Sequence, residues 1–240
     1  MNIIIPLAGK GSRLSQAGYK VPKPLIKIGE KTIMQWAIDT IGLKGNFIFC
    51  CKKEHIQKFN LDEKLRNIIP NCKIISINEE TEGTAQTILQ ASEFIDNDEE
   101  LFISDSDHFM IWDYNSFSLQ ITKKPIDACV MVYPDKQTSN AYSYVKINDD
   151  GFVTESAEKI PISAIAVAGM HYYKKGSDFV TYAKKMISKN IRFNNEFYVT
   201  PVYNQLIMDG KKIITYPIER KWPLGDPDEI IAFRKRFKND

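Results

Sequence analysis

The feature that most constrains the fold is the alternation, up to residue 104, of short apolar runs with segments of helical periodicity. Short β-branched runs are typical of buried strands, and apolar residues spaced by helical turns are typical of amphipathic helices. Strands that alternate with helices favour a parallel, doubly wound α/β sheet. The predicted strands are 2–7, 46–51, 73–77 and 101–104, and the predicted helices are 32–41, 56–69 and 84–95.

After about residue 125 the pattern changes to closely spaced strand-like runs. The turn sequence Asn148-Asp-Asp-Gly151 between two of them is typical of a hairpin. No linker-like stretch separates the two halves, so we expect one domain over 1–240, with halves of about 1–125 and 126–240 and a β-rich lobe late in the chain. The later predicted strands are 128–133, 143–147, 152–155, 164–173 and 213–217, and the later predicted helices are 176–188, 197–208 and 227–237.

The composition excludes several classes of protein. The net charge is only +2, so the chain lacks the strongly basic field of nucleic-acid binders. No stretch approaches the roughly 20 apolar residues that span a bilayer, and the apolar run before Pro6 is too short for a signal peptide. We therefore expect a soluble cytoplasmic protein without nucleic-acid partners or membrane insertion. The cysteines lack zinc-ligand spacing and suit a reducing compartment; they are Cys50, Cys51, Cys72 and Cys129.

A glycine-rich loop follows the first predicted strand. Gly9 and Gly11 allow a sharp turn and bring backbone N–H groups close to a ligand, and successive N–H groups form an anion-binding concavity. Ser12 adds a hydroxyl, and Arg13 adds a forked cation suited to phosphate oxygens. The spacing fits neither a P-loop nor the dinucleotide fingerprint, which argues against a nicotinamide-dependent dehydrogenase. An ordinary strand-to-helix turn is the alternative interpretation.

A lysine flanked by prolines follows this loop. Pro22 and Pro24 fix their own φ angles and restrict the residues before them, so Lys23 is expected to project from a stiff, extended segment. A preorganised ammonium group is a suitable partner for a polyphosphate. The alternative for Lys23 is a solvated loop lysine.

Together, Leu7-Ala-Gly-Lys-Gly-Ser-Arg13 and Pro22-Lys-Pro-Leu25 resemble the signature of the sugar-phosphate nucleotidyltransferase superfamily. The resemblance implies a Rossmann-like fold and an enzyme that couples a nucleoside triphosphate to a phosphorylated acceptor, with release of pyrophosphate. Glu82-Gly-Thr-Ala85 resembles the segment that lines the base, where Gly83 would let the backbone approach the base and Thr84 could cap the next helix. The nucleotide-binding residues implied are Leu7, Ala8, Gly9, Gly11, Ser12, Arg13, Lys23, Glu82, Gly83, Thr84, Ala85 and Ser106.

Two aspartates follow the fourth predicted strand. The carboxyl ends of parallel strands are where such sheets bind ligands, and Mg²⁺ prefers carboxylate and phosphate oxygens. The resemblance implies that Asp107 holds a catalytic Mg²⁺, with Asp105 as a supporting position and His108 as a neighbour. Aspartates of a surface turn are the alternative.

The second half resembles the family's acceptor side. Glu158-Lys159 is similar to an element whose lysine holds the acceptor phosphate, although Ile160 intervenes before Pro161. Gly169 would admit the close approach of the substrate. Glu196 is a candidate for binding an acceptor amine or hydroxyl, or is an acid in the first turn of a helix.

The segment Trp222-Pro-Leu-Gly-Asp226-Pro departs from the family pattern. The family often carries a second metal-binding aspartate two residues before the glycine, and here that position is Pro223. Asp226 is therefore either the second metal ligand or the N-cap of the last helix.

The implied catalytic residues are Arg13, Lys23, Asp107 and Lys159, which would position the substrates and neutralise their charge. The chain most resembles compact bacterial capsule-type cytidylyltransferases of the CTP:phosphoglutamine kind, with Mg²⁺ as cofactor. A hexose-1-phosphate uridylyl- or thymidylyltransferase and a non-catalytic nucleotide sensor are the alternatives. The sequence leaves open whether the chain forms a homodimer.

Overall fold

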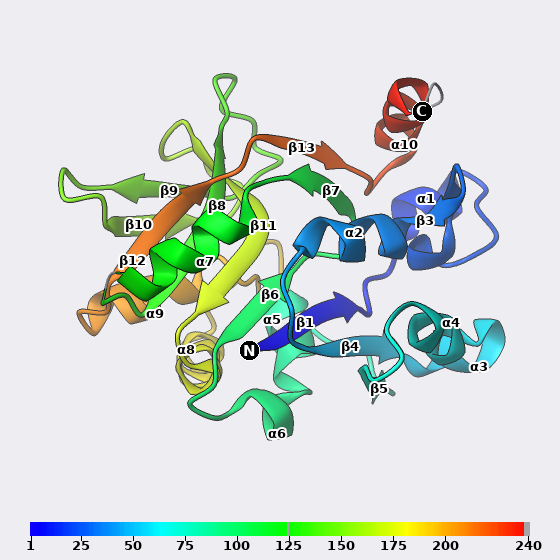
Figure 1. Cartoon of the computed structure of the whole chain (residues 1–240), viewed down its shortest axis with the longest axis horizontal. Coiled ribbons are helices and arrows are strands. Elements are labelled where there is room, and N and C mark those ends of the chain that lie inside the picture. The colour runs from blue at the N-terminus through cyan, green and yellow to red at the C-terminus, as the bar shows by residue number, and fades with distance from the viewer. Residues whose placement is uncertain (124, 238–240) are drawn as a thin grey trace.

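A nine-stranded sheet forms the centre of the computed structural model, which describes residues 1–123 and 125–237 (Figure 1). Its main path runs in the order β10-β9-β11-β6-β1-β4-β5, and β8 joins β11 to β12 beside this path. The strands are β1 (Asn2–Leu7), β4 (Asn46–Lys52), β5 (Lys73–Ile77), β6 (Leu101–Ser104), β8 (Ala128–Pro134), β9 (Tyr144–Ile147), β10 (Val153–Ala157), β11 (Ile165–Tyr173) and β12 (Ile213–Pro217).

The N-terminal half is the parallel, doubly wound sheet that the alternation predicts. β1 pairs in parallel with β4 and β6, and β4 pairs in parallel with β5. Ile3 and Ile5 pack into a core on one face of the sheet, whereas Ile4 packs into the core on the other. Burial on both faces explains why β1 is a continuous apolar run rather than an alternating one.

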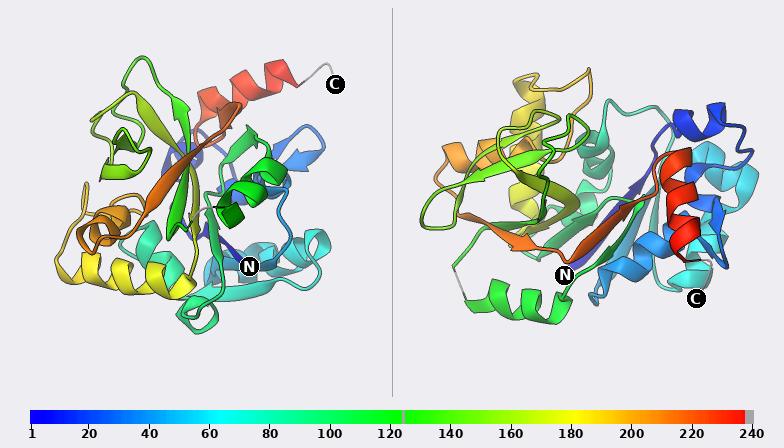
Figure 2. Two further views of the ribbon diagram at one scale, coloured as in Figure 1. Left: turned by 60° about the vertical axis from the view of Figure 1, so that its left-hand side comes forward. Right: turned by 90° about the horizontal axis from the view of Figure 1, so that it is seen from above.

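Helices cover both faces of the sheet. Figure 2 shows α2 and α7 on one side and α8 on the other. The helices of the first half are α2 (Ile33–Ile41), α3 (Lys53–Phe59), α4 (Leu61–Ile68), α5 (Thr84–Leu89), α6 (Ser92–Ile95) and α7 (Tyr114–Lys123). Those of the second half are α8 (Gly176–Ser188), α9 (Val202–Met208) and α10 (Pro227–Arg236).

The second half makes the sheet mixed. β11 pairs antiparallel with β6 and β8, and its register shifts between Val167 and His171. Gly169 lies within this shift with φ of +94°, a conformation that side chains with a Cβ rarely adopt. The predicted hairpin is also present, since β9 and β10 are joined through a turn in which the Gly151 N–H donates to Asn148 O.

Three predicted helices differ from the structure. The segment 56–69 is covered by α3, which begins earlier at Lys53, and by α4, with Asn60 between them. The segment 84–95 is divided at Gln90 and Ala91 into α5 and α6, and the helix predicted over 197–208 begins only at Val202. Pro201 is the N-cap of this helix, and the restriction that proline places on the preceding residue agrees with the late start.

A two-stranded ribbon outside the main sheet was not predicted. β7 (His108–Ile111) pairs antiparallel with β13 (Arg220–Pro223), and the Leu224 N–H donates to Asp107 O at 2.8 Å. Trp36, Phe109 and Phe233 pack edge-to-face beside this ribbon. The ribbon therefore brings the chain that leads into α10 against the end of β6. The remaining short elements are α1 (Ser12–Gln16), η1 (Lys23–Leu25), β2 (Lys27–Ile28) and β3 (Lys31–Thr32).

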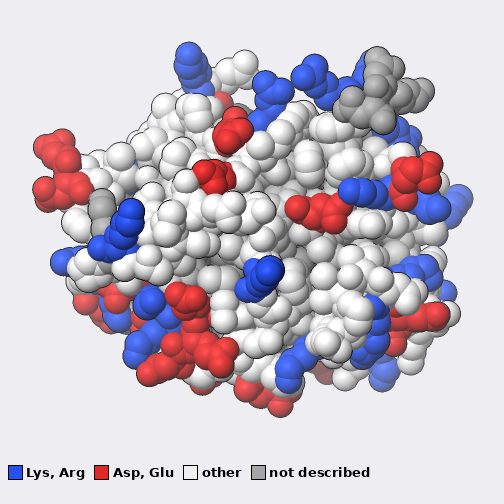
Figure 3. Space-filling view, viewed as in Figure 1, with Lys and Arg blue, Asp and Glu red and all other residues white. Residues whose placement is uncertain are grey.

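The face seen in Figure 3 carries basic and acidic side chains side by side, in keeping with the small net charge. Among the described residues, no helix is long and apolar enough to cross a membrane.

Candidate active site

A cavity of about 440 Å³ opens where β1 and β6 end. The loop after β1, the start of α5, the residues after β6 and the segment that leads into α10 all line it. Ligands of open α/β sheets bind at the carboxyl ends of their strands, so this is the position that the fold predicts for a site.

Part of the glycine-rich loop faces the cavity. Gly9 and Arg13 line it, together with Leu7 and Ala8. Gly11 does not line the cavity; it is the N-cap of α1, has φ of +61° and lies near Lys23, because a Cβ placed on it would be 3.6 Å from Lys23 Cβ. Ser12 is the first residue of α1, is exposed and is not among the lining residues.

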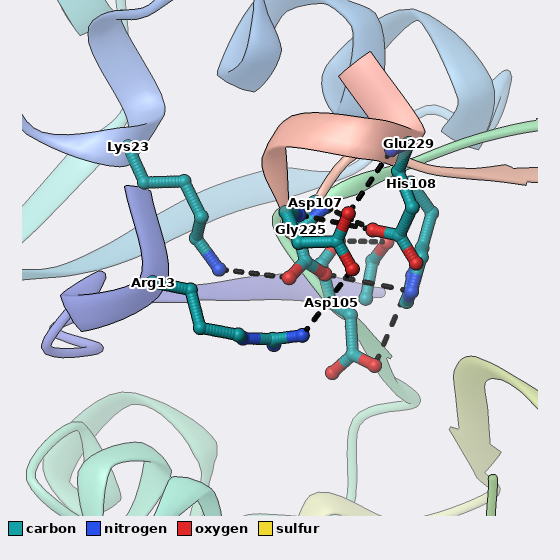
Figure 4. A network of polar contacts seen from close by, with 9 residues as sticks. Arg13, Lys23, Asp105, Asp107, His108, Gly225 and Glu229 are labelled. Carbon is teal, nitrogen blue, oxygen red and sulfur yellow. Dashed lines mark hydrogen bonds and ion pairs between the residues drawn. The ribbon is translucent and has the colours of Figure 1, made fainter. Parts of the chain in front are cut away.

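Lys23 and Asp107 form an ion pair in the cavity wall, with Nζ and Oδ2 2.8 Å apart (Figure 4). Their side chains are only 20% and 21% exposed, so solvent screens this pair less than a surface pair. The backbone is extended at Pro22, but Lys23 itself begins the short η1 turn with Pro24 as its second residue. The expectation of an extended backbone at Lys23 was therefore wrong, and its side chain lines the cavity.

The two aspartates after β6 have opposite titration behaviour. Burial, together with the charge of Asp107, raises the pKa of Asp105 to about 7. Burial also disfavours the charged form of Asp107, but the charge and hydrogen bond of Lys23, together with the other nearby positive charges, outweigh this effect and hold the pKa of Asp107 below its usual range. Burial lowers the pKa of His108 to about 3, so this imidazole is neutral at pH 7.

Lys221 is a site residue that sequence reasoning missed. It lies on β13 opposite Met110 and lines the cavity. Burial lowers the pKa of its ammonium group, and the carboxylates of Asp105 and Asp107 oppose that effect. It stands one position before the segment that departs from the family pattern, and no local sequence pattern marks it as a site residue.

Asp226 caps the last helix. Its Oδ1 accepts from the Glu229 N–H at 3.0 Å, and Glu229 Oε2 accepts in return from the Asp226 N–H, which completes a capping box. Asp226 Oδ2 lies 3.6 Å from an Arg13 nitrogen. The helix-cap alternative for Asp226 is thus realised, and its other oxygen faces Arg13.

The segment expected to line the base faces the cavity only in part. Gly83 and Thr84 line it, whereas Ala85 is buried and Glu82 forms an ion pair with Arg192 at 3.1 Å. Thr84 does not cap α5, because Gly83 is its N-cap and no side chain caps this helix. Ser106 is buried in the cavity wall.

Gly83 is required for a contact between two protein segments. Its φ is +129°, and an added Cβ would collide with the backbone of Phe197. The Phe197 N–H donates to Glu82 O at 2.7 Å, and Phe197 O accepts from the Ala85 N–H at 2.9 Å. The close approach that the sequence assigned to a base is therefore made by the Phe197 backbone.

Replacing Gly83 by alanine is expected to destabilise the protein by about 2–6 kcal/mol, since strained backbone and overpacking each cost about 1–3 kcal/mol. Chemical denaturation would measure the loss. Gly9→Ala is the control, because an added Cβ there meets no described atom within 4 Å. We expect its effect to stay within about 0.5 kcal/mol, and equal losses in the two variants would contradict the packing argument.

Lys159 lines the cavity from the second half of the chain. Its Nζ donates to the Tyr198 hydroxyl at 2.7 Å, and its backbone has φ of +54°. Such a left-handed conformation is uncommon for a lysine and marks a position held by its surroundings. The neighbouring Glu158 is buried and accepts from the Ser143 hydroxyl; burial raises the pKa of Glu158.

Glu196 and Gly169 differ from their predicted settings. Glu196 lines the cavity but lies in a turn that pairs with Phe193, well before α9, so it is not a first-turn helix acid. At Gly169 an added Cβ would collide with the Asp105 carboxylate and lie 2.9 Å from the His108 ring. The space that this glycine leaves is thus taken by Asp105 and His108 rather than by a substrate.

His171 lies buried in the cavity wall, with Nδ1 3.1 Å from the Tyr203 hydroxyl. Burial lowers its pKa from 6.5 to about 3, so the unfolded chain binds a proton here at a higher pH than the folded chain does. The stability that this histidine contributes is therefore present above pH 6.5 and is lost as the pH falls toward about 3.

We expect His171→Gln to reduce the pH dependence of the unfolding free energy by about 1.4 kcal/mol per pH unit within this window. Urea denaturation at several pH values would test it. His55→Gln is the control, because His55 is only half-buried and its pKa is lowered less. Parallel curves for wild type and His171→Gln would contradict the prediction.

Comparisons with known proteins fit this geometry. The profile of the nucleotidyl transferase family matches residues 2–234. The bifunctional protein GlmU of Thermodesulfovibrio yellowstonii is 25% identical over 254 residues, which cover 98% of this chain and 50% of that protein. The chain thus spans about half the length of the curated relatives it matches.

Two solved structures share the fold. The nucleoside-diphosphate-sugar pyrophosphorylase from Vibrio cholerae RC9 superposes with a TM-score of 0.83 at 23% identity, over 97% of this chain and 99% of that one. A UDP-glucose pyrophosphorylase complexed with UDP-glucose has a TM-score of 0.78 at 18% identity, over 99% of this chain and 98% of that one. These likenesses confirm the Rossmann-like, mostly parallel mixed α/β fold.

Proposed function

The chain belongs to the nucleotidyl transferase family, and on this premise we propose that it transfers a nucleotidyl group from a nucleoside triphosphate to a hexose 1-phosphate, with release of pyrophosphate. The observation that carries the proposal is a single cavity lined by cationic side chains from both halves of the chain. Arg13 and Lys23 line it beside the glycine-rich loop, and Lys159 lines it on the opposite half of the chain.

The acceptor class is supported by the proteins of like fold. One is named as a pyrophosphorylase of nucleoside-diphosphate sugars, and the other contains UDP-glucose. These names favour a hexose 1-phosphate as acceptor over the phosphoglutamine that the capsule-type resemblance implied. They also favour a nucleotide such as UTP over CTP.

The cationic residues beside the glycine-rich loop would neutralise the negative charge of the triphosphate. In the proposed reaction a phosphate oxygen of the acceptor attacks the α-phosphorus in line, and pyrophosphate leaves. The acceptor is already an anion, so positioning and charge neutralisation carry most of the catalysis. Arg13 and Lys23 would bind the triphosphate, while Lys159 would hold the acceptor phosphate beside it.

Proteins of this family usually use a divalent metal such as Mg²⁺. Asp107 fits such an ion, because carboxylate oxygens together with substrate phosphates are the ligands that Mg²⁺ prefers. When bound, the ion would neutralise the charge that develops between the α-phosphate and the leaving group. In the free protein the Asp107 carboxylate is held by Lys23, which would turn to the triphosphate when the substrate enters.

A capsule-type cytidylyltransferase remains the second candidate. The observation in its favour is that two carboxylates, Glu158 and Glu196, line the cavity near Lys159 and could receive an ammonium group of the acceptor.

The test is a matrix of the four nucleoside triphosphates against glucose 1-phosphate, glucosamine 1-phosphate, phosphocholine and phosphoglutamine, read by pyrophosphate release. We expect turnover with a hexose 1-phosphate and UTP or dTTP. Turnover only with CTP and with phosphocholine or phosphoglutamine would favour the second candidate. If nucleotides bind without turnover across the matrix, the chain acts as a nucleotide sensor and the proposal is wrong.

A further inference from the structure

A buried imidazole of β11 lies in the wall of the cavity. His171 is paired with Ile103 of β6 on one side and with Val130 of β8 on the other (Figure 1). The residue is only 3% exposed, yet it is one of those that line the cavity. The residues that bind the two substrates in the proposed reaction do not include it. A polar ring is therefore available to a bound substrate at this point.

The two ring nitrogens of His171 have different surroundings. Nδ1 lies 3.1 Å from the Tyr203 hydroxyl, whereas Nε2 has no hydrogen-bond partner in the part of the chain that the structure describes. Nε2 is not enclosed by protein either, in contrast to Nδ1 of His55 and Nδ1 of His108, which are enclosed and unpaired. Since the side chain lines the cavity, Nε2 is the nitrogen that a ligand can reach.

The Tyr203 hydroxyl determines which nitrogen carries the proton of the imidazole. This hydroxyl has a single proton, which it donates to Cys129 O at 3.4 Å. It then accepts from His171, so we assign the proton to Nδ1 and a lone pair to Nε2. Burial and the positive charge of Lys221 lower the pKa of His171 to about 3, so the ring is neutral at pH 7. The imidazole thus presents a hydrogen-bond acceptor to the cavity.

Backbone and side-chain contacts connect this part of β11 to the proposed acceptor side. Val167, which also lines the cavity, donates its N–H to Ser143 O at 2.8 Å. The Ser143 hydroxyl donates in turn to Glu158, the neighbour of Lys159. Because Lys159 is proposed to hold the acceptor phosphate, the acceptor rather than the triphosphate is the substrate that His171 would meet.

We propose that His171 Nε2 accepts a hydrogen bond from a hydroxyl group of the acceptor sugar and thereby determines which sugar phosphates the enzyme uses. The inference rests on the proposed function, since that function makes the acceptor a hexose 1-phosphate. A bound sugar displaces water from the cavity, so an analogue without the donating hydroxyl leaves Nε2 unpaired. A site that bonds to a substrate hydroxyl rejects such analogues for this reason.

Two substitutions separate the two nitrogens of His171. The side-chain amide of asparagine replaces Nδ1, so His171→Asn can keep the bond to Tyr203 while it loses the acceptor in the cavity. The longer glutamine places its amide near the position of Nε2, so His171→Gln can keep an acceptor there. The matched control is His55→Asn, because His55 is not among the residues that line the cavity.

The probe is the hexose 1-phosphate that wild type turns over fastest, or glucose 1-phosphate if none is turned over, together with each of its singly deoxygenated analogues. For wild type we expect one analogue to lower kcat/KM by about tenfold, mainly through KM, as the loss of one neutral hydrogen bond would. His171→Asn should use the parent sugar about as poorly as this analogue and should not distinguish the two. His171→Gln should retain part of the discrimination, and His55→Asn should retain all of it.

NMR of the ¹⁵N-labelled histidines provides a measurement that does not need turnover. The chain has only three histidines, so the signals of His171 are identified by their loss in either variant of this residue. In free wild type we expect the proton on Nδ1, and we expect the parent sugar phosphate to shift the Nε2 resonance. This measurement decides the assignment even if His171→Asn folds poorly.

Three outcomes would overturn the assignment: a protonated Nε2 in the free protein, an Nε2 resonance that the sugar phosphate leaves unchanged, or equal discrimination among the analogues in wild type and His171→Asn. A purely structural role of His171 would weaken the use of the parent sugar and of every analogue alike. These outcomes are distinct from failure of the proposed function. Turnover of a hexose 1-phosphate with unaltered discrimination in His171→Asn refutes only the role of His171, whereas a shifted Nε2 resonance without turnover refutes only the transfer reaction.

Discussion

Replacing Asp107 by alanine is expected to lower the rate of pyrophosphate release by a factor on the order of 10³ while the chain stays folded. The substitution removes the carboxylate proposed to hold the cation and leaves the Lys23 ammonium without the partner it contacts at 2.8 Å. Steady-state rates would measure the loss, with the nucleotide and acceptor that wild type turns over fastest in the substrate matrix. Circular dichroism would verify the fold.

The matched control is the pair Lys31–Asp39, whose Nζ and Oδ2 are 2.6 Å apart on the surface. Asp39→Ala removes an aspartate from the same kind of ion pair outside the cavity, so we expect near-normal turnover. Asp107→Asn preserves the shape of the side chain and should be nearly as inactive as Asp107→Ala. Near-normal turnover in either Asp107 variant would remove this residue from the catalytic set.

Local sequence patterns were sufficient to predict the parallel half of the fold. The strands β1, β4, β5 and β6 are each indicated by a short run rich in apolar residues. The helix α2 is bounded by Thr32 as N-cap and by Gly42 with φ of +65° at its C-cap. Such signals lie within a few residues of the element they define, so one sequence contains them in full.

The ribbon of β7 and β13 could not be predicted in this way. Its two strands of four residues each are far apart in the chain, and neither has a periodicity that distinguishes it from a loop. Their pairing depends on the aromatic packing of Trp222 and Phe109, which only the folded chain creates. Lys221 was missed for the same reason, because its burial against Asp105 and Asp107 follows from that pairing.

Gly83 and Gly169 show a second limit of prediction from the sequence. The sequence indicates that Gly83 and Gly169 lie where space is needed, but it does not say which group takes that space. In the structure the Phe197 backbone takes it at Gly83, and Asp105 with His108 takes it at Gly169. The groups that take these spaces come from distant segments, so local sequence patterns could not identify them.

Replacing Lys23 by alanine is expected to lower turnover by a factor on the order of 10² to 10³, because the triphosphate loses a preorganised positive charge. Lys23→Arg retains the charge but changes the geometry of the donor, so its activity should lie between that of wild type and that of Lys23→Ala. Lys31→Ala, from the exposed ion pair, should leave the rate unchanged. Turnover of Lys23→Ala close to that of wild type would contradict the role of Lys23.

The double variant Lys23→Ala/Asp107→Ala decides whether the two residues act as one unit. Residues in direct contact have non-additive effects, and groups that serve one step can each cost nearly as much as both together. Because Lys23 and Asp107 are in contact and are proposed to serve the same triphosphate, we expect the double variant to be at most about tenfold slower than Asp107→Ala. If the rate loss of the double variant equals the product of the two single losses, each side chain acts independently. Their ion pair in the free protein would then not couple cation binding to nucleotide binding.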